Sequence, residues 1–301
     1  MKDERFEEML RIRAEDPGAV ASRAALRPRR PMLGPDGRLM IVAVDHPARR
    51  ILRVGDRPYA MADRRLLLDN TIRALRRPGV DGLLASPDVL EDLLLLGELD
   101  HKVLFGSMNR GGLTGSTWEL DDRFTAHDPS TIARLGLDGG KMLLRIDYSD
   151  PGTVATMQSC AQAVAGLAER KLLALIEPLP AFRDEHGRVR ISDDIDLLVE
   201  AVAVASALGP TSAYTWLKLP VSSEPERMMA ATTLPALLLG GDPGDRAIEM
   251  MEGWRRAMAI PNVRGLVAGR SLIFPADGEI EKWVDAAVAI VHGDLLPGNG
   301  G

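Results

Sequence analysis

The stretch Lys141-Met142-Leu143-Leu144-Arg145-Ile146-Asp147 decides the fold, because it is a short apolar run followed by a helical segment and a second apolar run. The helical segment is Thr153–Arg170, and the second run is Leu172-Leu173-Ala174-Leu175-Ile176-Glu177. Runs of six or seven residues with period-2 alternation are typical of strands, and the longer segment has helical periodicity. This part of the chain therefore predicts a strand, a helix and a second strand.

The same alternation extends along the whole chain. Short runs rich in Val, Ile and Leu predict eight strands, at Leu39–Asp45, Val80–Ala85, Lys102–Gly106, Lys141–Asp147, Leu172–Glu177, Tyr214–Leu219, Ala236–Gly240 and Gly265–Gly269. Helical patterns lie at Met61–Arg76, Asp88–Leu96, Pro129–Leu135, Thr153–Arg170, Asp193–Leu208, Pro225–Thr232, Asp245–Ala259 and Gly278–Val291. Eight such units in about 250 residues predict a closed (β/α)₈ TIM barrel. An open doubly wound sheet is the alternative.

The predicted barrel does not occupy the whole chain. We assign it to residues 31–294 and expect a helical extension over residues 1–30, with one helix at Lys2–Ala25 that covers the base of the barrel. We expect a disordered tail over residues 295–301.

The composition narrows the possible partners. Of 301 residues, 46% are apolar and 27% are charged, and the net charge is −6. The basic residues are scattered along the chain and form no basic stripe, which argues against a nucleic-acid partner. The longest apolar runs, such as Leu93–Leu96, are too short to cross a membrane. The charged start Met1–Arg5 does not resemble a signal peptide, and Cys160 is the only cysteine. We therefore expect a cytoplasmic protein without disulfides.

Lys218 is the residue to which we give most weight. In a barrel of this class the chemistry lies at the carboxyl ends of the strands and in the loops that follow. Alternation in Tyr214–Pro220 places Leu217 and Leu219 toward the helices and Lys218 toward the mouth of the barrel. An apolar cage would lower the pKa of the amine, and a neutral amine attacks carbonyl groups to form a Schiff base. A core lysine in an ion pair is the alternative interpretation.

Other charged residues are expected inside the same barrel. Alternation turns Lys141, Arg145 and Asp147 inward, while Met142, Leu144 and Ile146 form an outer apolar face. Buried charges need partners, and Glu177 and Asp45 stand at the ends of the fifth and first predicted strands. We expect a compensating set of Lys141, Arg145, Lys218, Asp45, Asp147 and Glu177 with coupled pKa values. Such a set can also be purely structural.

The last two strands favour an anionic substrate. Gly240-Gly241-Asp242 and Gly269-Arg270-Ser271 follow them, at positions where barrels commonly bind phosphate through backbone N–H groups. Glycine allows close approach to the phosphate, and Arg270 adds charge. We therefore predict a phosphate site at Gly240, Gly241, Gly269 and Arg270, and assign Arg145 to the same substrate-binding group. Ordinary turns are the alternative for the glycines.

A metal centre is a weaker hypothesis. The five histidines, His46, His101, His127, His186 and His292, show no H-x-H or H-x-x-x-H spacing. Only His46 and His127 lie where a metal ligand would be useful. We predict no metal and no cofactor.

These motifs together resemble a known enzyme group. Asp45-His46, Trp216-Leu217-Lys218-Leu219-Pro220 and the paired glycines resemble the class I aldolases of the deoxyribose-phosphate and fructose-bisphosphate aldolase superfamily. The segment 140–148, with Leu175-Ile176-Glu177 and Lys218, is similar to tagatose-bisphosphate and deoxyketogluconate-phosphate aldolases. Two positions depart from the pattern of the fructose-bisphosphate branch. His46 is followed by Pro47 where that branch usually has Gly, and Lys218 is followed by Leu-Pro where related sequences continue with Val-Glu or similar residues. These departures concern the substrate more than the type of reaction.

The resemblance implies a role for each matching residue. Lys218 would form the Schiff base, Lys141 and Glu177 would assist, and Asp45 would match the aspartate of the first strand. The prediction is a class I aldolase that makes or breaks a C–C bond in a sugar phosphate or related hydroxy-carbonyl compound. We expect a homo-oligomer, with no nucleic-acid or membrane partner. The alternatives are a metal-dependent lyase or hydrolase, and a non-catalytic barrel that binds sugar phosphates.

Overall fold

The structure is a computed structural model that describes residues 2–241 and 247–293. The predicted tail at 295–301 and the start of the predicted helix Asp245–Ala259 lie outside these residues. Within the two described ranges, no helix combines the length and the apolar character needed to cross a lipid bilayer.

The described strands form a closed parallel barrel. They are β1 (Leu39–Val44), β2 (Gly82–Ala85), β3 (Val103–Ser107), β4 (Gly139–Ile146), β5 (Leu173–Arg183), β6 (Val189–Ile191), β7 (Thr215–Leu219), β8 (Ala236–Leu239) and β9 (Val263–Ala268). Eight of them pair in parallel in the order β4-β3-β2-β1-β9-β8-β7-β5, and pairing between β4 and β5 closes the ring. This confirms the predicted TIM barrel and rules out the open sheet.

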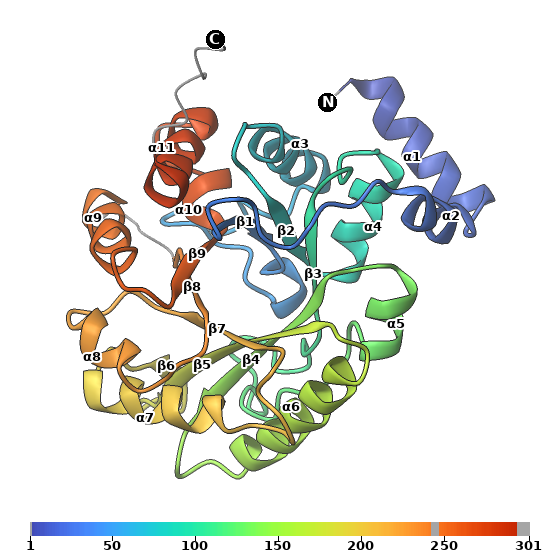
Figure 1. Ribbon diagram of the computed structural model, residues 1–301. Helices are drawn as coiled ribbons and strands as arrows, with labels where there is room; N and C mark the ends of the chain where they lie inside the picture. The colour runs from blue at the N-terminus through green and yellow to red at the C-terminus, as the bar shows by residue number, and fades with distance from the viewer. Residues whose placement is uncertain (1, 242–246, 294–301) are drawn as a thin grey trace.

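Helices surround the strands (Figure 1). Those that alternate with the strands are α3 (Arg64–Leu75), α4 (Pro87–Leu95), α5 (Pro129–Arg134), α6 (Gly152–Ala168), α7 (Ile195–Ser206), α8 (Pro225–Met229), α9 (Ala247–Ala257) and α11 (Ile280–His292). Two short elements, η1 (Pro47–Arg49) and α10 (Arg270–Ile273), directly follow β1 and β9. Each predicted helix overlaps an observed one.

The N-terminal extension differs from the prediction. It contains two helices, α1 (Asp3–Glu15) and α2 (Ala19–Leu26), because Pro17 has no N–H group to continue the first one. Both lie beside α4 on the outside of the barrel (Figure 1), where Arg13 contacts Asp92 at 2.6 Å. The expectation that a helix covers the base is therefore wrong.

The segment 27–38 crosses the base instead (Figure 1). Arg27 donates to the carbonyl oxygens of Lys102 and Gly136, each at 2.9 Å, just before β3 and β4 begin. Met32 packs against the apolar residues inside the barrel. This segment therefore covers the lower mouth of the barrel.

Side chains alternate across the strands as predicted. Leu217 and Leu219 belong to the apolar layer between strands and helices, whereas Trp216 belongs to the smaller cluster inside the barrel. Met142, Leu144 and Ile146 also join the outer layer. The intervening residues of β4 and β7 are therefore turned inward.

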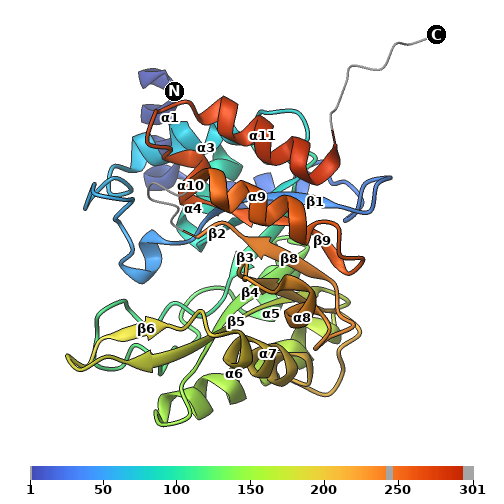
Figure 2. The ribbon, with the colours of Figure 1, turned by 90° about the vertical axis from the view of Figure 1, so that its left-hand side faces the viewer.

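Strand β5 is longer than predicted. It continues beyond Glu177 and turns back into β6, with Ala181 opposite Ile191 and Arg183 opposite Val189. Prolines at 178 and 180 are tolerated because the pairing with β7 has ended at Ile176, so no ladder bond is lost on that side. Figure 2 shows that this β5–β6 hairpin projects from the open end of the barrel.

Candidate active site

A cavity of about 420 Å³ occupies the open mouth of the barrel. All nine site residues predicted from the sequence line it, namely Asp45, Lys141, Arg145, Glu177, Lys218, Gly240, Gly241, Gly269 and Arg270. They come from the ends of six strands, because parallel strands deliver their carboxyl ends to one rim. The structure therefore brings the predicted residues together, while their chemical roles stay predictions.

Glu177 lies between two lysines at the centre of the cavity. Lys218 Nζ, from β7, donates to Glu177 Oε1 at 2.8 Å. Lys141 Nζ, from β4, forms an ion pair with Glu177 Oε2. The register explains the contact, since β5 pairs with both β4 and β7. Each carboxylate oxygen therefore holds one amine.

Asp45 lies directly after β1 on the other side of Lys141. Its Oδ2 accepts hydrogen bonds from Arg110 at 2.5 Å and Ser107 at 3.2 Å, and it lies 3.6 Å from Lys141 Nζ. A second donor nitrogen of Arg110 contacts the Asp45 carbonyl oxygen at 3.0 Å. His46 Nδ1 lies 3.9 Å from Oδ1, beyond hydrogen-bonding distance. Oδ1 is therefore the oxygen that a substrate hydroxyl can reach.

These five side chains form a buried set with one excess cation. Lys141, Lys218 and Arg110 carry three positive charges, whereas Asp45 and Glu177 carry two negative charges, and each residue is 3–7% exposed. A buried cation without a counter-charge is unfavourable, so such a set favours the loss of one proton. The expectation of an apolar cage around Lys218 is wrong, because Glu177 contacts the amine directly.

The pKa shifts follow from this arrangement. Burial lowers the pKa of Lys141 to about 8, because Glu177 and Asp45 only partly offset it. Burial would raise the pKa of Glu177, but Lys141 and Lys218 outweigh it and hold it at about 2. Burial would also raise the pKa of Asp45, but Arg110 and Lys141 outweigh this effect and keep the pKa well below its usual value. Both carboxylates are therefore ionised at neutral pH.

Arg145 has partners that the sequence did not indicate. Its guanidinium contacts Glu119 and lies 3.6 Å from Asp122, two residues of the loop between β3 and α5. Asp147 does not line the cavity; its carboxylate accepts hydrogen bonds from Ser149. The expectation that Arg145 and Asp147 belong to the central compensating set is therefore wrong, because the β3–α5 loop supplies the counter-charges of Arg145.

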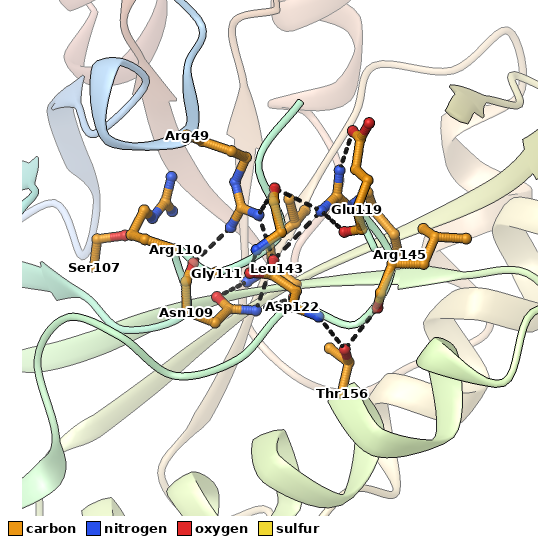
Figure 3. A network of polar contacts seen from close by, with 12 residues as sticks. Arg49, Ser107, Asn109, Arg110, Gly111, Glu119, Asp122, Leu143, Arg145 and Thr156 are labelled. Atoms are coloured by element: carbon orange, nitrogen blue, oxygen red, sulfur yellow. Dashed lines mark hydrogen bonds and ion pairs between the residues drawn. The ribbon is translucent and has the colours of Figure 1, made fainter. Parts of the chain in front are cut away.

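Figure 3 shows how this loop is held against β4. Asn109 continues the β3–β4 ladder with its side chain, accepting from Leu143 N at 2.8 Å and donating to Leu143 O at 2.6 Å. Asp122 accepts from Gly112 N at 2.8 Å and forms an ion pair with Arg49. The loop thereby carries Arg110 into contact with Asp45.

Glycines at the rim after β8 and β9 lie in close contact with neighbouring residues. A Cβ atom built on Gly269 would lie 2.8 Å from Cε1 of His46, so a larger residue would displace this ring. Gly241 has a φ of +61°, a conformation that favours glycine. Ser271 is buried beside Gly240, and its Oγ has no hydrogen-bond partner among the described residues. Ser271 does not line the cavity, whereas Gly240, Gly241, Gly269 and Arg270 do.

The two histidines of the metal hypothesis are separated. His46 lines the cavity, and burial lowers its pKa to about 3. His127 does not line the cavity, and its Nδ1 lies 3.2 Å from the carbonyl oxygen of Ser107. Over residues 2–241 and 247–293, no three His, Cys, Asp or Glu side chains are grouped in a way that could hold a metal ion.

Sequence reasoning gave no role to four polar residues that line the cavity, namely Arg49, Arg110, Thr114 and Glu119, nor to Asp122 behind them, which pairs with Arg49. Arg110 stands three residues after β3, so its position at a strand end was a usable signal. Glu119 and Asp122 lie in the middle of a long loop without periodicity, and no pattern marked them.

Comparison with known families identifies the family to which the chain belongs. The family model described as Cgl0159-like matches residues 37–288, which include every barrel strand. The chain belongs to the Cgl0159-like family. The crystal structure of Cgl0159 from Corynebacterium glutamicum has a TM-score of 0.95 and 45% identity, over 98% of this chain and 99% of that one. The fold described above is therefore shared along almost the full length of this Cgl0159 relative.

More distant structures share the barrel. A Schiff-base-forming fructose-1,6-bisphosphate aldolase has a TM-score of 0.64 at 16% identity, over 91% of this chain and 100% of that one. An archaeal fructose-1,6-bisphosphate aldolase with its catalytic lysine bound to the carbinolamine intermediate has a TM-score of 0.63, also at 16% identity, over 90% and 99%. No curated protein sequence matches this chain. These likenesses show that the (β/α)₈ barrel fold is shared with the two aldolases.

Proposed function

We propose that this protein is a class I aldolase that uses Lys218 to form a Schiff base. The observation that carries the proposal is the pair of lysines on one carboxylate, Glu177, in an open cavity. With one cation in excess, the pair can exist with one amine neutral and the other protonated. A class I mechanism needs both forms, since the neutral amine is the nucleophile and the ammonium supplies a proton.

The reaction would begin at the Lys218 nitrogen. The neutral amine attacks the substrate carbonyl carbon, and the C=O bond becomes the C–O bond of a carbinolamine. The Lys141 ammonium protonates the hydroxyl, which leaves as water, and an iminium ion forms.

Bond cleavage would follow from the positive charge of the iminium. A carboxylate removes the proton of the hydroxyl two carbons away, the C–C bond breaks, and its electron pair passes to the iminium to give an enamine. Asp45 is favoured over Glu177 as this base, because both oxygens of Glu177 already hold amines while Asp45 Oδ1 is not hydrogen-bonded within the described set. Protonation of the enamine carbon and addition of water then release the product and regenerate Lys218.

The rim after β8 and β9 would bind a phosphate of the substrate. Gly240, Gly241 and Gly269 allow the backbone to approach it, and Arg270 adds a positive charge. Arg145, the remaining member of the predicted binding group, comes from β4, four strands from β9 around the ring, and we assign it to the opposite wall. The likeness to Schiff-base aldolases that act on fructose bisphosphate supports a sugar-phosphate substrate.

Borohydride trapping tests the proposal. Incubation with a phosphorylated ketose and sodium borohydride should raise the intact mass by that of the reduced adduct. Lys218→Arg should abolish this gain, whereas Lys171→Arg, at an exposed lysine outside the cavity, should not affect it. An adduct of equal yield in Lys218→Arg would contradict the proposal. Activity that is lost to a chelator and restored by a metal would favour a metal-dependent enzyme instead.

A further inference from the structure

His46 is a cavity residue to which the proposed reaction gives no role. It follows Asp45 after β1, and its side chain lines the cavity and is 18% exposed. Its Nδ1 is shielded from solvent and forms no hydrogen bond with any residue that the structure describes. Nε2 also has no partner within residues 2–241 and 247–293, but it is not shielded. His46 therefore presents an unused hydrogen-bonding nitrogen to the cavity.

The neighbours of the imidazole place it beside both the proposed base and the proposed phosphate rim. Nδ1 lies 3.9 Å from Asp45 Oδ1, the oxygen that would take the proton from the substrate hydroxyl. Cε1 lies so close to Gly269 that a Cβ atom on this glycine would be 2.8 Å away. Lys218 and Arg270 are near enough to disfavour a positive charge on the ring. A substrate bound to Lys218, with its phosphate at the rim, would therefore run past the ring.

The imidazole is uncharged at neutral pH. Burial lowers the pKa of His46 to about 3, and the attraction of Asp45 offsets this only in part. A neutral imidazole has one N–H group and one nitrogen lone pair. We assign the proton to Nδ1, because this nitrogen lies nearest the Asp45 carboxylate, which attracts an N–H group and repels a lone pair. Nε2 is then a hydrogen-bond acceptor.

An acceptor in this place selects the group that it binds. A sugar hydroxyl can donate to Nε2, whereas a phosphate dianion has no proton to donate. Because Nδ1 rather than Nε2 faces Asp45, we do not expect one hydroxyl to reach both acceptors.

From this arrangement we infer that Nε2 of His46 accepts a hydrogen bond from a second substrate hydroxyl, distinct from the one that Asp45 would deprotonate. His46 is then a specificity-determining residue. The inference rests on the proposed aldolase function and narrows its substrate class to phosphorylated ketoses that carry both hydroxyls.

Substrate analogues that lack single hydroxyls test the inference. Fructose, tagatose, psicose and sorbose would each be screened as the 1-phosphate and the 6-phosphate by borohydride trapping. The ketose phosphate that is trapped best would then be compared with its 3-deoxy and 5-deoxy analogues, which keep the hydroxyl two carbons from the carbonyl. In the wild-type protein, one of these analogues should need a concentration about tenfold higher for half-maximal trapping, because Nε2 loses its donor. Equal concentrations for the ketose and both analogues would overturn the inference while leaving the aldolase proposal intact.

Variants of His46 decide whether this residue is the acceptor. His46→Phe keeps an aromatic ring without a nitrogen, so the ratio of the two half-maximal concentrations should fall to near one. His46→Gln supplies an oxygen acceptor at a similar distance from the backbone and should keep most of the difference. His186→Phe, at an exposed histidine outside the cavity, is the control and should keep the wild-type ratio.

Two further outcomes are decisive. A tenfold ratio that persists in His46→Phe, with folding verified by circular dichroism, would overturn the inference, because another group would then hold the hydroxyl. Absence of any adduct between the wild-type protein and all the ketose phosphates would overturn the aldolase proposal itself, and the inference with it.

Discussion

Lys218 Nζ and Glu177 Oε1 lie 2.8 Å apart, although 41 positions separate the two residues in the chain. The contact exists because β5 pairs with β7, and because Glu177 and Lys218 are turned inward directly after the last paired positions, Ile176 and Leu217. The same carboxylate also holds Lys141, which makes the protonation state of each amine dependent on the other. This dependence leads to the first predictions.

Substitution of Glu177 should affect both amines. Glu177→Gln removes the charge but keeps the shape, so the pKa of Lys141 should fall below about 8. Because Lys141 acts as an ammonium in the proposed reaction, the alkaline limb of the activity profile should move to lower pH. We expect kcat/KM to fall by about 100-fold or more, because the lysines lose the group that orients them. Glu185→Gln, at an exposed glutamate of the β5–β6 turn, is the matched control and should behave as wild type. An unshifted alkaline limb would argue against electrostatic coupling.

Substitution of Lys141 should slow formation of the Schiff base. Lys141→Met removes the ammonium that would protonate the departing hydroxyl, so borohydride trapping at pH 7 should slow by about 100-fold. Lys141→Arg keeps the positive charge but does not release its proton, so trapping should also be slow in this variant. Trapping by Lys141→Met at the wild-type rate would contradict the proposed role of Lys141.

The contact between Arg110 and Asp45 should stabilise the fold in a pH-dependent way. Burial raises the pKa of Asp45, but Arg110 and Lys141 outweigh it and lower the pKa, so this stabilisation is present above the unfolded pKa of about 3.9 and is lost as pH falls further. Arg110→Met should reduce the free energy of unfolding at pH 7 by about 3 kcal/mol, because Asp45 would lose a buried partner. Urea unfolding of both proteins between pH 3 and pH 7 measures this. A loss that is the same at all pH values would point to packing instead.

A second pH-dependent contact closes the base of the barrel. His292 on α11 lies 3.0 Å from Asp81 and also contacts Asp36 of the segment 27–38. Burial lowers the pKa of His292, but Asp81 and Asp36 outweigh it and raise the pKa above 6.5. The stabilisation is therefore complete below about pH 6.5 and is lost as pH rises through the folded pKa. His292→Gln should cost on the order of 1 kcal/mol at pH 6 and less at pH 9, measured by urea unfolding.

Much of the barrel could be predicted because its signals are local. Apolar alternation placed all eight barrel strands and turned Lys141 inward, and polar residues at strand ends marked Asp45, Glu177 and Lys218 as its neighbours in one cavity. The carboxyl ends of parallel barrel strands lie at one rim, which brings such residues together. The same reasoning placed the glycines and Arg270 after β8 and β9 at the rim of the cavity, while their role in phosphate binding stays a prediction.

The features that were missed depend on contacts between distant residues. Glu119 reaches Arg145 only because the β3–α5 loop folds back onto β4, and no periodic pattern describes such a loop. The β5–β6 hairpin was hidden because Pro178 and Pro180 interrupt the usual strand signal. The prediction of a single N-terminal helix was wrong because Pro17, which has no N–H group, separates α1 from α2.

The most direct test of the account is to locate the adduct in the chain. After borohydride reduction with a phosphorylated ketose, proteolysis and mass spectrometry should assign the added mass to the peptide that contains Lys218. The peptide that contains Lys141, the other lysine of the cavity, should be unmodified. Modification of Lys141 in the wild-type protein, with Lys218 unchanged, would contradict the central claim.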